Sequence, residues 1–70
     1  MTVYEAELGK PYTVREIKTG DAELDSFLFS LGCYSGEPIT VISRRRSGCV
    51  VAIKDGRYHI DKGLASVILV

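Results

Sequence analysis

The spacing of apolar residues changes from a helical to a strand period between Leu31 and Ile39. Upstream of the change, four apolar residues recur at the three- and four-residue intervals that place them on one face of a helix: Leu24, Phe27, Leu28 and Leu31. Downstream, Ile39 and Val41 alternate with a polar residue, which is the period of two that strands require. The sequence therefore predicts one short helix at residues 22–31 of this region, with strands from Ile39 onward.

Capping residues set the bounds of the predicted helix, and glycines separate the predicted strands. Asp21 suits the N-cap and Gly32 suits a left-handed stop after Leu31. Asp55-Gly56 predicts a tight hairpin, and residues 44–48 predict a polar turn. Five short strands are expected, at residues 12–17, 39–41, 49–54, 57–60 and 67–70, with a turn or one helical turn over residues 61–66.

The length of 70 residues limits how these strands can be arranged. Five short strands are too few for a large two-sheet sandwich, and a flat open sheet would expose long unpaired edges. A small, strongly bent, partly closed barrel removes most of those edges. We therefore expect a mainly β fold over residues 1–70, in a single domain.

Charge and hydropathy exclude several classes of function. Nine basic side chains balance nine acidic ones, which argues against a nucleic-acid-binding protein. The apolar runs at residues 50–53 and 67–70 are far shorter than the ~20 residues that span a bilayer, so no membrane insertion is expected. The first seven residues are acidic and lack the pattern of a signal peptide. We expect a cytoplasmic protein with reduced cysteines.

Three short patterns in the chain resemble the FeoA family of small SH3-like barrels, which is associated with bacterial ferrous iron uptake. The family has a helix ending in Leu-Gly, a second Gly four residues later, a Val-x-Val strand, and a closing Ala followed by Ile-x-Val. The matching positions here are Leu31, Gly32, Gly36, Ile39, Val41, Ala65, Ile68 and Val70. The resemblance implies an SH3-like five-stranded barrel with one short helix after the first strand, and these residues define that fold.

The resemblance also implies a partner, the cytosolic region of a ferrous iron transporter of the FeoB type. Phe29 falls off the apolar stripe of the predicted helix and Tyr34 lies just beyond its end, so both are candidates for exposed aromatic contacts. Phe27, Leu28 and Leu31 are expected to form a plug that closes one end of the barrel. The run Arg44, Arg45 and Arg46 is interpreted as a solvated hairpin tip, with docking to an acidic surface or to anionic headgroups as the alternative.

No nucleophile with a matching base occurs in the sequence, so an enzyme is not expected. Cys33, Cys49 and His59 are weak candidates for binding Fe²⁺ or Zn²⁺, because no ligand spacing pre-organises a site. We interpret the two cysteines as packed apolar residues and His59 as a surface side chain. A metal-binding regulator or carrier is the alternative function, an SH3-like module with an unrelated partner is the third, and a monomer or weak dimer is expected.

Overall fold

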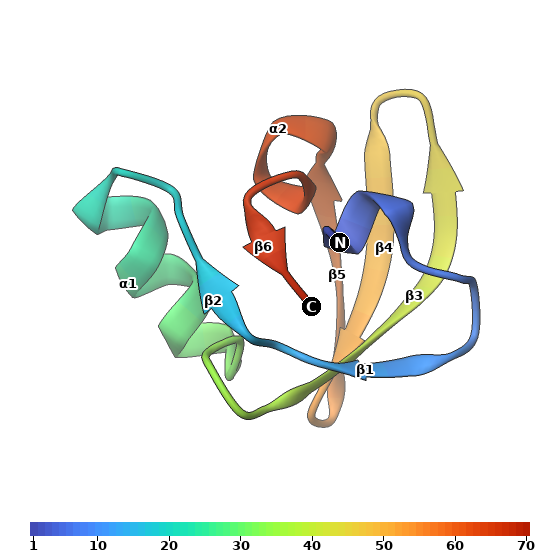
Figure 1. Cartoon of the computed structure of the whole chain (residues 1–70), viewed down its shortest axis with the longest axis horizontal. Helices are drawn as coiled ribbons and strands as arrows, with labels where there is room; N and C mark the ends of the chain where they lie inside the picture. Colours follow the sequence, from blue (N-terminus) through green and yellow to red (C-terminus); the bar gives the residue numbers. More distant parts are fainter.

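Two antiparallel sheets wrap around one apolar core in the computed structural model, which describes residues 1–70 (Figure 1). The four-stranded sheet has the order β1-β3-β4-β5, and β2 pairs with β6 in the second sheet. In chain order the elements are a 3-10 helix η1 (Val3–Glu5), β1 (Pro11–Thr13), β2 (Glu16–Ile17), α1 (Ala22–Leu31), β3 (Pro38–Arg45), β4 (Gly48–Ile53), β5 (Gly56–Asp61), α2 (Lys62–Ala65) and β6 (Ile68–Leu69).

The corner between the two sheets lies at Val14 and Arg15. The Val14 N–H donates to the carbonyl of Glu37, and the Val14 carbonyl accepts from Gly36, so this residue still belongs to the β1 side. One residue later the Arg15 N–H donates to the carbonyl of Leu69 in β6. The single strand predicted over residues 12–17 is therefore two strands, because the chain exchanges one partner strand for another at this point.

A β-bulge in β3 interrupts the alternation of its side chains. Val41 pairs with Val51, but Ser43 pairs with Val50, so Ile42 is the extra residue. Because a bulge inserts one residue, each side chain beyond Ile42 points to the face opposite the one that uninterrupted alternation would give. The polar turn predicted over residues 44–48 consists of two residues only, 46 and 47, since β3 continues to Arg45.

The β4–β5 hairpin is confirmed, with its turn one residue earlier than predicted. Ile53 pairs with Gly56, which leaves Lys54 and Asp55 as the two loop residues. Lys54 adopts the left-handed conformation, with φ of 52°, so a non-glycine residue has the positive φ. Gly56 is instead the first residue of β5.

The core contains no buried polar or charged side chain, and it is built from the inward positions of both sheets. Its fourteen residues are Val3, Ala6, Val14, Leu28, Cys33, Ile39, Val41, Cys49, Val51, Ile53, Ile60, Ala65, Ile68 and Val70. Ile39 and Val41 point inward as the alternation predicted, and Ala65, Ile68 and Val70 contribute from the C-terminal segment. Leu31 is half-buried against this cluster.

Both ends of α1 are capped as the sequence predicted. The Asp21 carboxylate accepts from the N–H groups of Glu23 and Leu24, at 2.9 and 3.3 Å. Gly32 has φ of 90° and donates to the carbonyl of Phe29, and Cys33 donates to Leu28, which together form a Schellman motif. The bounds of the helix therefore come from local hydrogen bonds.

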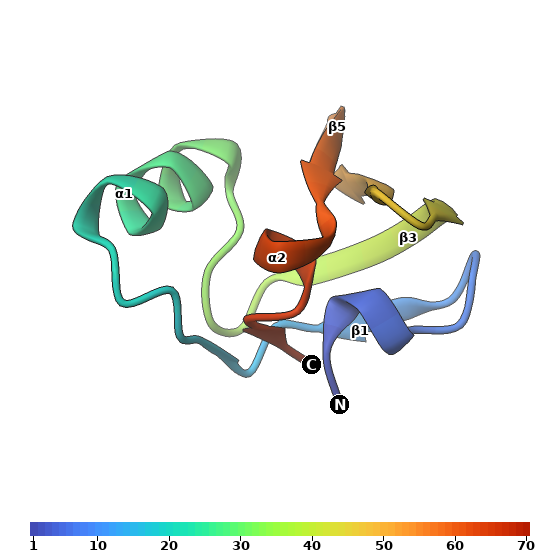
Figure 2. The same ribbon diagram turned by 90° about the horizontal axis from the view of Figure 1, so that it is seen from above.

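The expected plug is wrong for Phe27, because α1 extends away from the sheets (Figures 1 and 2). Leu28 is fully buried, but Phe27 is 48% exposed and Leu24 is 39% exposed. Helix η1 and α2 contribute Val3 and Ala65 to the core instead. Leu31 is half-buried against the core, so Leu28 is the one residue of α1 that is buried completely.

The mainly β, SH3-like class with one short helix after the first strand is confirmed. The two sheets do not close into one continuous hydrogen-bonded barrel, so the structure is an open version of the predicted one. The N-terminus joins the second sheet, since Thr2 bridges to Leu69 and the Val70 N–H donates to the carbonyl of Met1.

A helix of ten residues that packs weakly depends on its caps, so substitution of Asp21 is expected to loosen α1 alone. Loss of the N-cap in Asp21→Ala costs about 1 kcal/mol. Amide exchange in α1 should therefore accelerate about fivefold while exchange in β3 and β4 is unchanged. Hydrogen exchange followed by NMR measures this, with Asp21→Asn, which retains a capping oxygen, as the control. Equal acceleration in the sheet would show that α1 is not a separate unit of stability.

Candidate interaction surface

Phe29 and Tyr34 form a stacked aromatic pair beside the C-terminal end of α1. Their ring centroids lie 4.9 Å apart with 30° between the ring planes. Phe29 is 65% exposed, and Tyr34 is half-buried in the segment that follows Gly32. The helix places the first ring, and the glycine stop turns the chain so that the second ring lies against it. The structure therefore brings together the two aromatic residues that the sequence proposed for partner contacts.

Lys54 packs against the aromatic pair from the β4–β5 turn. Its ammonium lies 5.6 Å from the centroid of the Tyr34 ring and donates a hydrogen bond to Glu37 Oε2 at 2.8 Å. This hydrogen bond lowers the pKa of the Glu37 carboxyl and raises the pKa of Lys54. The side chain of Lys54 passes over Gly32, where an added Cβ would lie 2.8 Å from Lys54 Cε. Gly32 therefore has two roles: its positive φ ends the helix, and its lack of a Cβ leaves room for the Lys54 side chain.

A groove of about 270 Å³ runs beside the N-terminal half of α1. Leu24 lines it from α1, and Leu64 and Val67 line it from α2 and the segment that follows. Thr19 and Asp61 supply polar atoms at this groove. The apolar stripe in the sequence predicted that Leu24 and Phe27 are buried. Both are partly exposed instead, because α1 runs away from the second sheet.

The three arginines of the predicted tip have different environments. Arg44 lies in β3 and donates from Nη1 to the carbonyls of Ala6 at 2.6 Å and Tyr4 at 3.3 Å, so it fastens η1 to the sheet. Arg45 is also in β3, and only Arg46 lies in the turn. The prediction that all three form a tip is therefore wrong, because the strand is longer than its alternating apolar residues suggested.

The aromatic pair and the arginines do not form one surface. Figures 1 and 2 both show the β3–β4 turn and α1 at opposite ends of the molecule. The predicted contact residues therefore separate into an aromatic surface at α1 and a basic region on β3.

The cysteines are packed in the core and His59 lies outside it. Cys33 and Cys49 are 1% and 2% exposed and both are free thiols. His59 is exposed and pairs with Val50, so it is on the outer face of the sheet, whereas Cys49 is on the inner face. No group of three or more His, Cys, Asp or Glu side chains is placed to hold a metal ion. The geometry gives no support to a metal site built from Cys33, Cys49 and His59.

We expect Arg44 to be a stabilising residue, in contrast to its neighbour in the turn. Arg44→Ala removes two hydrogen bonds and leaves the carbonyl of the buried Ala6 without its donor, a loss of about 1–2 kcal/mol in the free energy of unfolding. Arg46→Ala, at an exposed turn position, should change that free energy by less than about 0.5 kcal/mol. Urea denaturation of both variants measures the difference. Equal effects would show that the contact with η1 contributes nothing.

Burial makes the thiol of Cys33 sensitive to alkaline pH. Burial raises its pKa to about 11, whereas an unfolded thiol titrates near about 8.5. As the pH rises, the unfolded chain therefore loses this proton before the folded protein does. The contribution of the protonated thiol to the free energy of unfolding is complete below about pH 8.5 and is lost as the pH approaches 11. Cys33→Ala lacks this contribution. The difference in free energy of unfolding between the parent and Cys33→Ala should therefore decrease by about 1 kcal/mol per pH unit above pH 9. Urea unfolding from pH 7 to 11 tests this, and parallel curves would contradict it.

Neither α1 nor α2 has the length and apolar composition needed to cross a membrane. A search of the curated proteins found no significant match. Among solved structures, one described as a manganese-dependent transcriptional repressor superposes with a TM-score of 0.85 at 22% identity, covering 96% of this chain and 38% of that chain, which shows a shared fold.

A crystal structure described as the iron uptake regulatory protein FeoA superposes with a TM-score of 0.86 at 26% identity. The match covers 97% of this chain and 91% of that chain. The family model for the FeoA domain matches residues 1–70. The chain therefore belongs to the FeoA family, whose small domains have an accessory role in ferrous iron transport.

Proposed function

We propose that this protein is a cytoplasmic, non-catalytic accessory protein of ferrous iron transport that acts by contacting the cytosolic region of a FeoB-type transporter. Family membership supports the pathway, and the exposed Leu24 and Phe27 of α1, with the aromatic pair, support action by protein contact. The exposure of Phe29 is the observation that carries the proposal, since a large ring outside the core contributes little to folding.

The aromatic pair has the properties of an interface anchor. Aromatic side chains that lose little freedom on binding supply much of the energy of small interfaces. Phe29 is already restrained by stacking on Tyr34, which is itself covered by the ammonium of Lys54. The pair therefore presents apolar area in a fixed position, so a partner covers it without ordering it first.

Charge on α1 indicates the kind of segment that binds there. The N-cap Asp21 and the first-turn residues Glu23 and Asp25 are acidic, and the last turn of the helix has no basic residue. An acidic helix with exposed Leu24 and Phe27 complements a segment that carries both basic and apolar side chains. We propose that the transporter contributes such a segment to the face of α1.

Substitution of Phe29 is expected to weaken binding to the transporter without unfolding the protein. Because Phe29 is 65% exposed, Phe29→Ala should leave the free energy of unfolding within about 0.5 kcal/mol, while binding falls about tenfold or more. Isothermal titration calorimetry with the purified cytosolic domain of the transporter measures the dissociation constants of the parent and of the variant. Phe29→Leu should retain part of the affinity.

Arg46→Ala is the matched control, because Arg46 is also exposed and lies in the β3–β4 turn, at the opposite end of the molecule from α1 (Figure 1). Iron uptake in cells that carry each variant provides the functional readout. The proposal fails if the parent protein does not bind the transporter domain and deletion leaves uptake unchanged. Equal loss of affinity in both variants would place the contact elsewhere than α1.

A further inference from the structure

The bulge at Ile42 places two polar side chains of β3 on the outer face of the four-stranded sheet. Arg44 pairs with Cys49, whose side chain is in the core, so Arg44 lies on the inner side and reaches η1. Its neighbours Ser43 and Arg45 consequently point to the outer side. Without the bulge, the alternation that buries Ile39 and Val41 would carry on through residues 43 and 45.

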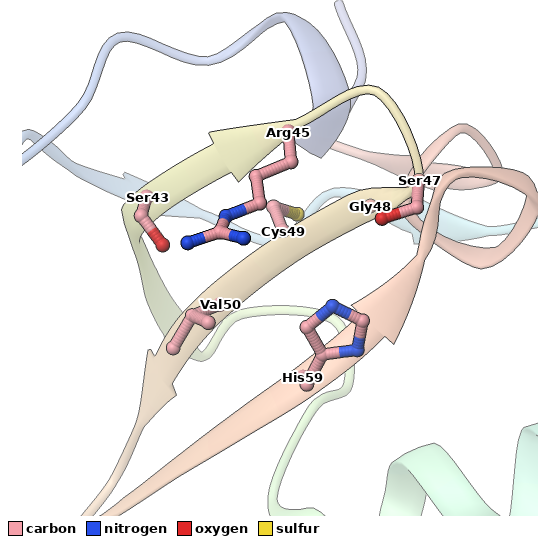
Figure 3. Close-up of a pocket in the computed structure, with 7 residues that line it drawn as sticks. All are labelled: Ser43, Arg45, Ser47, Gly48, Cys49, Val50 and His59. Carbon is pink, nitrogen blue, oxygen red and sulfur yellow. The ribbon is translucent and has the colours of Figure 1, made fainter.

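A pocket of about 290 Å³ lies on this outer face. Ser43 and Arg45 line it from β3, Ser47 from the turn, and His59 from β5, with Val50 of β4 between them. Figure 3 shows the guanidinium of Arg45 beside the Ser43 hydroxyl, with the imidazole of His59 across β4 and the Ser47 hydroxyl toward the turn. Four side chains that can donate hydrogen bonds thus surround one space.

No acidic side chain neutralises this pocket. The ion pairs of the protein involve Lys10, Lys18 and Lys54, and none involves Arg45. The guanidinium of Arg45 also has no hydrogen-bond partner within the chain. Asp61, which pairs with Gly48 at the edge of the pocket, is not among the lining residues, and its carboxylate accepts from the N–H of Leu64 at 2.7 Å. A full positive charge is therefore left facing an open space that hydroxyl and imidazole donors share.

We propose that this pocket binds the phosphate group of a small ligand, through Arg45, Ser43, Ser47 and His59. A guanidinium presents paired N–H donors that match two oxygens of a tetrahedral anion, and such charge-assisted bonds are the strong ones. Hydroxyls from Ser43 and Ser47 supply further donors, and an imidazole donates from either ring nitrogen. The volume is at the small end of the range for ligand pockets, which suits a single phosphate group with a short substituent.

Additional positive charge on the same side favours an anion over other polar ligands. Arg57 pairs with Ala52 and so shares the outer face with His59, and Arg46 lies in the adjacent turn. Neither forms an ion pair within the chain. These charges raise the local concentration of phosphate without contacting it, so their removal is expected to weaken binding only slightly.

A titration of the ¹⁵N-labelled protein with inorganic phosphate tests the site directly. Sodium chloride at matched ionic strength is the control for non-specific screening. Saturable shifts should appear at the amides of Ser43, Ser47, Val50 and His59 and at the Nε–Hε resonance of Arg45, and residues of α1 should not move. Chloride should not reproduce these shifts.

Variants separate a built site from a general basic surface. Arg45→Ala should weaken phosphate binding about tenfold or more, as expected for losing one charge-assisted contact. Arg45→Lys should restore part of the affinity, since it keeps the charge but not the paired donors. Arg57→Ala is the matched control and should change the affinity less than about twofold. The amide spectra of all variants report whether the fold is intact.

A phosphate group can belong to a soluble molecule or to a lipid headgroup, and a second experiment distinguishes these sources. Sedimentation with phosphatidylglycerol vesicles, against phosphatidylcholine vesicles, measures lipid binding, with glycerol 3-phosphate as competitor. Binding to the anionic vesicles that Arg45→Ala abolishes indicates a headgroup, and a response to the soluble phosphates alone indicates a free ligand. The proposal is overturned if neither phosphate nor vesicles shift these resonances, or if Arg45→Ala binds as well as the parent. Neither result affects the contact proposed at α1, because that surface lies at the other end of the molecule.

Discussion

The exchange of hydrogen-bond partners at Val14 and Arg15 holds the two sheets together at one corner. Val14 is bonded to the segment before β3, and Arg15 is bonded to β6, so the chain cannot leave one sheet without entering the other. This corner sets the direction in which β2 runs, and residues 18–21 join β2 to α1. The position of α1 beside the sheets, and hence the exposure of Leu24 and Phe27, follows from this corner and not from the composition of the helix.

The bulge at Ile42 has a comparable effect on the other end of the molecule. One inserted residue divides a run of three arginines between two sides of the sheet, so that Arg44 stabilises the fold while Arg45 faces solvent. The same residue type in adjacent positions therefore has separate physical roles. A local irregularity in the hydrogen-bond ladder converts an apparent charge cluster into one structural contact and one available cation.

Local signals in the sequence were sufficient for the elements whose bounds depend on local hydrogen bonds. Asp21 and Gly32 delimit α1 as predicted, and the inward positions of Ile39 and Val41 follow from alternation. Burial of both cysteines also followed from residue type. The split of residues 12–17, the bulge and the exposure of Phe27 were not predictable, because each depends on which distant strand pairs with the segment. The stacked aromatic pair was indicated only as two separate residues, since the turn that joins them is a tertiary feature.

The two proposed surfaces lie outside the core and at different ends of the molecule. No polar or charged side chain is buried in the core, and Arg44, although it lies on the inner side of β3, stays exposed and bonds to the carbonyls of η1 and Ala6. The net charge of the whole chain is zero, but the acidic first turn of α1 and the β3–β4 turn that carries Arg46 lie at opposite ends of the molecule (Figure 1). The contact proposed at α1 and the anion pocket proposed on the outer face of the sheet therefore use different residues. A partner bound at α1 would not cover the pocket on the outer face of the sheet, because the two surfaces have no residue in common and the core lies between them.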